Sequence, residues 1–455
     1  MLILFVILYF AITVGIGIYA NGRISGGRDF INAGRNLHPV INAFALFALW
    51  FGSETLFGAS AEFAAAGITG IIEDPLGGVL CLLLVGLLYA RKMYRLNVLT
   101  LGDLFHRNFG HKIEMIASIL MTLSFVGYIA AQLLALGMML QMLLHGSLLT
   151  CMALALIIVL LYTTAGGMLA VSLTDFFQSI MIIIGLTMVA IFLTPHDMNW
   201  TRLSQSLPES HLRFWPENEW IPWLNWIASW MALGVGSIVS QDIFQRVNAA
   251  RNEKSAMTSS LAGAGLYAIF SILPIYIVWM IYLQFPHINA ELQMSLPLLV
   301  MERMPIGLQI LFFGSVISAI LSTCSGAILA PASLLAENIV KPLWRRPLSD
   351  LALLRITRAS TVIIGVIALW VASGSEKIFD LVGTSSAFGV VSIFVPYTMA
   401  LFFNAVSRPA ALLSMVLGST VWALCFFYLQ TDINPTILGL VASILGWYTG
   451  RYIKE

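Results

Sequence analysis

Apolar stretches of about 18 or more residues recur along this 455-residue chain, and each is long enough to cross a bilayer as a helix. Inside lipid, every backbone polar group must find its partner within the protein, which favours helices that bond internally. Hydrophobic residues make up 59% of the chain and charged residues only 10%, unlike a water-soluble domain. The sequence therefore predicts an all-α polytopic membrane protein whose surroundings are the lipid bilayer.

Hydropathy, combined with the positions of Gly, Pro and charged residues, predicts about 13 membrane spans in a single transmembrane domain, residues 1–455. The expected spans are residues 1–20, 38–66, 68–95, 113–144, 147–164, 168–194, 220–247, 256–285, 305–341, 355–373, 378–404, 409–430 and 433–451. Residues 1–37 would form the first span and an inner loop, and 405–455 two C-terminal spans. No connecting loop is long enough to form a separate domain.

The positive-inside rule predicts the orientation of the chain. With the N-terminus outside, all but four of the 23 Lys and Arg residues fall in loops predicted to lie inside; the exceptions are Arg202, Arg213, Arg303 and Lys377. The C-terminus is then inside. We expect a plasma-membrane protein, most simply of the bacterial inner membrane. The net charge of +1 gives no reason to expect a nucleic-acid partner.

Glycines interrupt two of the predicted spans near mid-membrane. In the second span, Gly52 and Gly58 flank a polar cluster that contains Glu54, and Gly234 and Gly236 interrupt the seventh span. Broken helices of this kind expose main-chain carbonyls and form binding sites in secondary transporters. Because the two breaks are five spans apart, we expect two inverted five-helix repeats, residues 38–194 and 220–404. Close packing on glycine is the simpler alternative.

The ninth span carries a run of small and hydroxyl residues, Ser318 to Ser325. Within it, Ala319, Ser322 and Thr323 share one helix face, since they stand three and four residues apart. Two hydroxyls and a carbonyl on one face suit a small hard cation such as Na⁺, although such residues also pack helices closely. The chain contains neither a Gly-x-Ser-x-Gly nor a His-Glu-x-x-His motif, so we expect no enzyme and no catalytic residues.

Four segments, in this order and spacing, resemble the sodium:solute symporter family. They are residues 29–35 (DFINAGR), 166–178 (GGMLAVSLTDFFQ), 244–246 (FQR) and 318–341 (SAILSTCSGAILAPASLLAENIVK). The resemblance implies a LeuT-type fold, with a 5+5 inverted-repeat core and flanking helices. It also implies a sodium site between the second and ninth spans. The implied ligands are the carbonyls of Ala48, Phe51 and Ala319 and the hydroxyls of Ser322 and Thr323.

The same resemblance implies that Asp175 and Ser325 form a second ion site. Gly326 departs from the pattern, because members with that site have serine there, and this departure puts a second ion in doubt. The alternative for Asp175 is an ion pair with an arginine near the inner end of the sixth span.

The expected solute site lies around the break in the second span. Trp50 resembles an aromatic residue of the choline carriers, which enclose a trimethylammonium group by cation–π attraction. Tyr128 matches a second aromatic of that cage, whereas Ser240 replaces a third. Glu54 favours a cationic or zwitterionic solute, such as an amino acid or a choline- or betaine-like molecule. We expect the solute to contact Trp50, Ser53, Glu54, Tyr128, Gln132 and Trp230.

These observations predict a sodium-coupled symporter that imports a small organic solute by alternating access, with Na⁺ as the coupling ion. Two alternatives stay open at this point. One is a transporter-like sensor that reports solute to a separate signalling partner. The other is a proton-coupled carrier in which Glu54 or Asp175 carries the proton.

Overall fold

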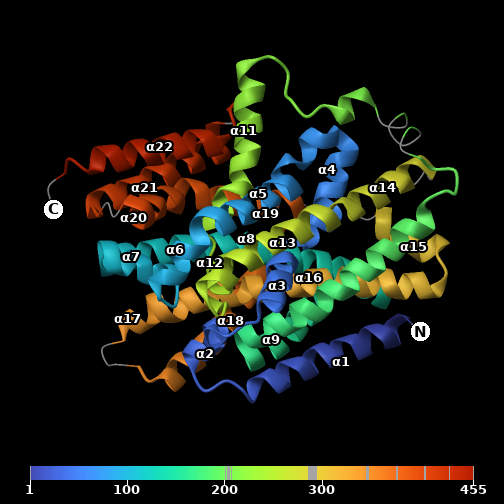
Figure 1. Ribbon diagram of the computed structural model, residues 1–455, viewed down its shortest axis with the longest axis horizontal. Coiled ribbons are helices and arrows are strands. Elements are labelled where there is room, and N and C mark those ends of the chain that lie inside the picture. Colours follow the sequence, from blue (N-terminus) through green and yellow to red (C-terminus); the bar gives the residue numbers. More distant parts are fainter. Residues whose placement is uncertain are drawn as a thin grey trace.

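The computed structural model describes residues 2–199, 201, 205, 208–284, 295–344, 348–375, 378–403, 406–429 and 431–453. Within these ranges the chain is helical, with a single isolated β-bridge between Leu37 and Ala250 and no β-strand. Figure 1 shows most helices lying alongside one another in one bundle. The prediction of an all-α architecture is confirmed.

The first half of the chain runs from the N-terminal helix to a long pair of helices. Its elements are α1 (Leu2–Asn21), α2 (Gly27–Asn32), η1 (Ala33–Arg35), α3 (Pro39–Trp50), η2 (Glu54–Gly58), α4 (Ala59–Ala66), η3 (Gly67–Ile71), η4 (Ile72–Leu76), α5 (Gly77–Leu84), η5 (Val85–Tyr89), α6 (Ala90–Leu96), α7 (Leu101–Phe109), α8 (His111–Leu144) and α9 (Leu148–Leu193).

The second half begins after a long loop and ends in an antiparallel pair. Its elements are η6 (Glu209–Leu212), α11 (Trp220–Gly234), η7 (Gly236–Val239), α12 (Gln241–Ala249), α13 (Glu253–Phe270), α14 (Ile272–Gln284), α15 (Ser295–Arg303), α16 (Ile306–Leu334), η9 (Leu335–Val340), α17 (Lys341–Leu343), α18 (Asp350–Ser373), α19 (Ile378–Gly389), η10 (Val390–Phe394), α20 (Val395–Phe403), α21 (Arg408–Leu424), η11 (Cys425–Leu429) and α22 (Pro435–Gly450).

Both breaks expected from glycine are present. The second span stops being helical at Phe51 (φ −86°, ψ 68°) and resumes at Glu54 as a π-helical turn. The seventh span bends by 52° between Val239 and Gln241. Each break frees backbone groups in the middle of the protein, where side chains and ligands can bond to them.

A third break divides α9, whose 46 residues would extend about 69 Å as one helix, more than twice the thickness of a bilayer. Gly167 (φ 50°, ψ −144°) interrupts it between the predicted fifth and sixth spans. A Cβ at Gly167 would lie 2.4 Å from the Phe30 carbonyl oxygen, so only glycine fits this bend.

Length and composition alone give nine crossing helices in the described part of the chain, or ten when the bent α11–α12 pair is counted as one span. The expected number of about 13 stays a prediction. The two numbers differ because α9 counts once despite its break, and because α3 and α22 are short apolar helices. The short helix α15, between the predicted eighth and ninth spans, was not predicted from the sequence.

The ninth span lies at the centre of the bundle. Every residue of α16 from Phe312 to Leu334 is buried, and α16 packs against α8, α9 and α3. The α21–α22 pair packs together at one edge, and α1 lies along α9 at another (Figure 1). The polar residues of α16 therefore face protein rather than lipid.

Candidate functional site

The break in the second span meets α16 at a cluster of oxygen atoms. The Thr323 hydroxyl lies 2.9 Å from the Ala48 carbonyl oxygen and 3.1 Å from the Ala319 carbonyl oxygen, with both of which it forms hydrogen bonds. All three residues are fully buried. The structure therefore brings together three of the five residues expected to bind sodium.

The other two expected ligands adjoin this cluster. The Ser322 hydroxyl donates a hydrogen bond to Asp175 Oδ1 and keeps its lone pairs available. Phe51 is the first non-helical residue after α3. The next residue, Gly52, packs against Thr323, since a Cβ at Gly52 would lie 3.0 Å from Thr323 Cγ2. The broken turn and the hydroxyl face of α16 are thus in direct contact.

Asp175 is paired with an arginine rather than with Ser325. Arg246 Nη2 lies 3.0 Å from Asp175 Oδ2, and both side chains are fully buried. Arg246 Nε also donates to the Ala45 carbonyl oxygen at 3.0 Å. The Ser325 hydroxyl instead donates to the Ser322 carbonyl within its own helix.

Gly326 makes room for this guanidinium group. A Cβ on Gly326 would lie 2.6 Å from Arg246 Nη2, closer than non-bonded atoms approach. The residue that departs from the family pattern in the sequence is therefore the one that the arginine packs against.

Four of the expected solute-binding residues form one hydrogen-bonded group. Tyr128 donates to Glu54 Oε1 at 3.0 Å, and the Gln132 amide donates to Glu54 Oε2 at 2.8 Å. The Ser53 backbone N–H donates to Gln132 Oε1 at 3.0 Å. In the described part of the chain no Lys or Arg pairs with Glu54, so neutral donors alone satisfy this buried carboxylate.

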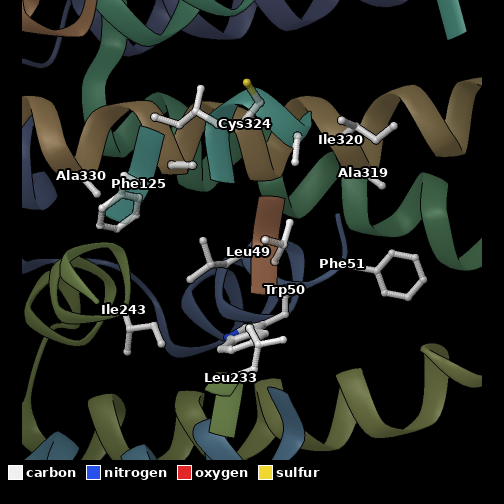
Figure 2. Packing of buried hydrophobic residues seen from close by; sticks show 14 of the residues in the cluster. Leu49, Trp50, Phe51, Phe125, Leu233, Ile243, Ala319, Ile320, Cys324 and Ala330 are labelled. Carbon is white, nitrogen blue, oxygen red and sulfur yellow. The ribbon is translucent and has the colours of Figure 1, made fainter. Parts of the chain in front are cut away.

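A cavity of about 60 Å³ lies beside this group, large enough for several water molecules. Its lining comes from the end of α3, from α8, from the break between α11 and α12, and from α19 with η10. Figure 2 labels five of the lining residues: Trp50, with Leu49, Leu233 and Ile243 near it, and Phe125 farther away. The Trp50 indole N–H is buried and has no hydrogen-bond partner in the described structure.

Trp230 does not line this cavity. It lies in an aromatic cluster on α11, 5.8 Å from Trp226 and 6.4 Å from Phe214 between ring centroids. Trp223 and Trp215 extend the same cluster. Of the six residues expected to contact solute, Trp230 is the one that belongs neither to the cavity lining nor to the hydrogen-bonded group around Glu54.

Asp242 lines the cavity, a role that was not predicted from the sequence. Its carboxylate accepts hydrogen bonds from the Ser240 hydroxyl and from the Ile243 backbone N–H, both on Oδ1. Oδ2 has no hydrogen bond in the described structure. A sequence signal existed: Asp242 follows the break of the seventh span just as Glu54 follows the break of the second.

Asp74 is a second buried acid that was not assigned. It accepts hydrogen bonds from Tyr267 at 2.6 Å and from Thr55 at 2.9 Å, and Thr55 also bonds to the Trp50 carbonyl oxygen at 3.0 Å. Asp74 therefore supports the broken turn through Thr55.

The family model of the sodium:solute symporter family matches residues 30–418. The chain belongs to the sodium:solute symporter family. The resemblance stated from the sequence motifs is thereby confirmed.

Among curated relatives of this symporter, the high-affinity choline transporter 1 of Drosophila melanogaster is 25% identical over 424 residues, which cover 88% of this chain and 66% of the fly protein. The human high affinity choline transporter 1 is 24% identical, covering 91% of this chain and 74% of its own length. The osmoregulated proline transporter OpuE of Bacillus subtilis is 24% identical over 96% of this chain and 92% of the bacterial protein.

Solved structures agree on the fold. A Na⁺-coupled sialic acid symporter in a substrate-bound outward-open state superposes with a TM-score of 0.85 at 18% identity, covering 100% of this chain and 98% of that one. The nucleobase-cation-symport-1 family transporter Mhp1 gives a TM-score of 0.61 at 14% identity, with 93% of each chain covered. The predicted LeuT-type fold is confirmed.

Family and fold are those of transporters, so sodium-coupled symport of a small organic solute is confirmed as the function class. The protein is a multi-pass membrane protein.

Proposed function

We propose that this symporter imports a small cationic or zwitterionic solute together with one sodium ion, in the plasma membrane and with its N-terminus outside. The observation that carries the proposal is the cavity beside the broken second span. It joins the Asp242 carboxylate to the aromatic rings of Trp50, Phe125 and Tyr128. The choline and proline transporters among its relatives carry solutes of these two kinds, as their names state.

The sodium ion would bind where Thr323 meets Ala48 and Ala319, with the Phe51 carbonyl and the Ser322 hydroxyl completing the set. Carbonyl and hydroxyl oxygens are the ligands that hard cations prefer. The hydrogen bond from Ser322 to Asp175 supports this assignment, because it fixes the serine oxygen while leaving its lone pairs for the ion.

One ion is proposed rather than two because Arg246 already neutralises Asp175. A second sodium at Asp175 and Ser325 would lie next to the buried guanidinium group and be repelled by it. Gly326 supports the same conclusion, since it offers no hydroxyl and leaves space that the arginine fills.

The solute would bind with its cationic group against the aromatic rings and near Asp242 Oδ2. Cation–π attraction contributes about 0.5–2 kcal/mol at a desolvated site, and a nearby carboxylate adds Coulomb attraction. The Trp50 N–H would donate to a hydroxyl or carboxylate of the solute, because this buried donor has no protein partner in the described structure. Glu54 would act indirectly, by holding Tyr128 and Gln132 in place.

Coupling follows from the position of Trp50. It stands between Ala48 and Phe51 in the chain, so the backbone that binds sodium also sets the direction of the Trp50 ring. Tyr128 lies within hydrogen-bond distance of the Leu49 carbonyl oxygen, at 3.1 Å, in the same turn. Sodium and solute would each raise the affinity of the other by the same factor. Entry of each positive charge contributes about 2.3 kcal/mol per 100 mV of membrane potential.

Thermal unfolding of the purified protein in Na⁺ and in K⁺ tests both parts of the proposal, since a ligand that binds only the folded state raises its stability. Wild type would be compared with the double variant Ser322→Ala/Thr323→Ala. Choline, betaine, proline and a neutral sugar would then be added in Na⁺. We expect a sodium shift that the double variant loses, and a further shift with a cation or zwitterion.

Absence of a sodium shift in wild type would contradict the ion site, and a shift with the sugar alone would contradict the solute class. Uptake of the stabilising solute into proteoliposomes separates a carrier from a sensor, because a sensor binds the solute without moving it.

A further inference from the structure

Two histidines and a glutamate meet at the junction between α7 and α8, and none of the three lines the proposed solute cavity. His106 is in the last turn of α7, and His111 and Glu114 are in the first turn of α8. Gly110 (φ +83°) turns the chain between the two helices, which brings the side chains to one side. By the distribution of basic residues, this junction is on the inner face.

The three ligand atoms are close enough to share one metal ion. His106 Nδ1 lies 2.7 Å from Glu114 Oε2, and His111 Nδ1 lies 3.0 Å from the same oxygen. All three atoms lie within 4.8 Å of one another. In a tetrahedral site with metal–ligand bonds near 2.0–2.1 Å, ligand atoms are about 3.3 Å apart. Only a small opening of these contacts would admit an ion.

The glutamate is held in place by a second layer of hydrogen bonds. Glu114 Oε1 accepts from the Asn338 amide at 2.8 Å, and Asn338 also donates to Asp103 Oδ1 at 2.9 Å. The Thr100 hydroxyl donates to Asn338 Oδ1 at 2.6 Å. Partners of this kind orient metal ligands and raise affinity, because the ligand loses little freedom on binding.

Burial and charge favour a cation at this position. The Glu114 side chain is 5% exposed, whereas His106 and His111 are 59% and 40% exposed, so an ion could enter from water and meet a buried carboxylate. In the described structure Glu114 has ion-pair contacts with these two histidines and with no Lys or Arg. Two imidazoles and one carboxylate suit Zn²⁺ and related divalent transition metals.

We propose that His106, His111 and Glu114 form a binding site for a divalent transition metal of the Zn²⁺ class, with water at its open position. Each histidine would bind through Nδ1 and Glu114 through Oε2. The site is separate from the proposed sodium site, whose ligands are oxygen atoms inside the bundle.

Metal at this site would act on transport through Asn338. Asn338 lies in η9, which continues the helix that carries Ser322 and Thr323. Gly102 of α7 packs tightly on Asn338, since a Cβ there would lie 2.3 Å from Asn338 Cγ. A bound ion would hold the α7–α8 junction against this helix. We expect a metal ion bound at this site to slow solute uptake, an expectation that rests on the proposed function.

Direct metal binding is the first test, and it does not depend on transport. Co²⁺, a spectroscopic substitute for Zn²⁺, would be titrated into untagged, chelator-treated protein while its visible absorption bands are recorded. We expect one saturable site that Zn²⁺ displaces. His106→Ala/His111→Ala should abolish the bands, and Asn338→Ala should weaken binding by roughly 10–100-fold.

His145→Ala is the matched control, because His145 caps the opposite end of α8. It should bind Co²⁺ as wild type does. Unfolding temperatures without metal would show that the variants are folded, and Glu114→Gln gives an independent loss of one ligand. Unchanged Co²⁺ bands in the double histidine variant, or no bands in wild type, would overturn the proposal.

Uptake assays then distinguish this site from the proposed function. With chelator present, the double histidine variant should transport as wild type does, and Zn²⁺ should slow wild type alone. Co²⁺ binding without any solute uptake would contradict the proposed function but leave the metal site standing.

Discussion

The guanidinium group of Arg246 lies 3.0 Å from the carboxylate of Asp175, and neither side chain has any exposed surface. The pair joins α12 to the second half of α9, and Ser322 of α16 bonds to the same carboxylate. Three helices from both halves of the chain therefore meet on one acid. The sequence alone left open whether Asp175 pairs with an arginine, and the structure shows that pair.

Loss of Arg246 should strongly destabilise the protein. Arg246→Ala leaves the buried Asp175 without its charged partner, which typically lowers the free energy of unfolding by about 3–5 kcal/mol. Arg246→Ala/Asp175→Asn should recover much of that loss, since the double variant leaves no buried charge from the pair. Unfolding transitions of the three proteins measure this coupling. Equal destabilisation in the single and double variants would show that the pair is not the cause.

Enlarging Gly326 should disturb the same pair. Gly326→Ala places a Cβ 2.6 Å from Arg246 Nη2, so the guanidinium group must move and the Asp175 and Ser322 contacts must shift with it. We expect weaker sodium activation of uptake and a lower unfolding temperature. Gly265→Ala is the matched control, because nothing lies within 4 Å of a Cβ there. A Gly326→Ala protein that behaves like the control would be evidence against the proposed packing.

Removing the Thr323 hydroxyl should weaken sodium binding while preserving shape. Thr323→Val leaves the Ala48 and Ala319 carbonyls without this donor, and it also removes one proposed ion ligand. Loss of a buried hydrogen-bond partner costs about 1–3 kcal/mol, equivalent to roughly 5–150-fold in affinity. The sodium concentration for half-maximal uptake reports the change. Thr323→Ser keeps the hydroxyl and should remain near wild type; an equal defect in both variants would point to packing instead.

Two substitutions of Trp50 should have different effects on solute affinity, because one removes the ring and the other keeps a ring but removes the indole N–H. Trp50→Leu removes the ring face and should weaken binding of a cationic solute by about 0.5–2 kcal/mol, roughly 2–30-fold. Trp50→Phe keeps a ring but loses the N–H, so it should chiefly weaken solutes that carry a hydroxyl or carboxylate. Apparent affinities from competition uptake compare the two variants.

Asp242→Asn should reduce affinity for cationic solutes without changing the sodium dependence of uptake, because Asp242 lines the cavity and does not contact the proposed ion ligands. The measurement is solute affinity at saturating sodium. Unchanged affinity for every cation and zwitterion tested would remove Asp242 from the site.

The sequence determined the class of fold and predicted where the site lies. Long apolar stretches require helices in lipid, and glycines at residues 52, 58, 234 and 236 marked the two interrupted spans. The spacing of Ala319, Ser322 and Thr323 put three oxygen-bearing residues on one face, since helical periodicity acts locally. Family motifs added the carbonyls of Ala48 and Phe51. The fold class and the two interrupted spans could be predicted because they depend on residues close together in the chain, whereas the ion ligands stay a prediction.

The tertiary structure decided which distant groups meet. Arg246 reaches Asp175 across 71 positions, and Tyr128 reaches Glu54 across 74. No local pattern specifies such contacts, because they depend on how broken helices pack and on the space left by residues such as Gly326. The same reason explains why Asp242 became a cavity residue while Trp230 joined an aromatic cluster. Burial and pairing of polar groups are properties of the packed bundle, not of any one segment.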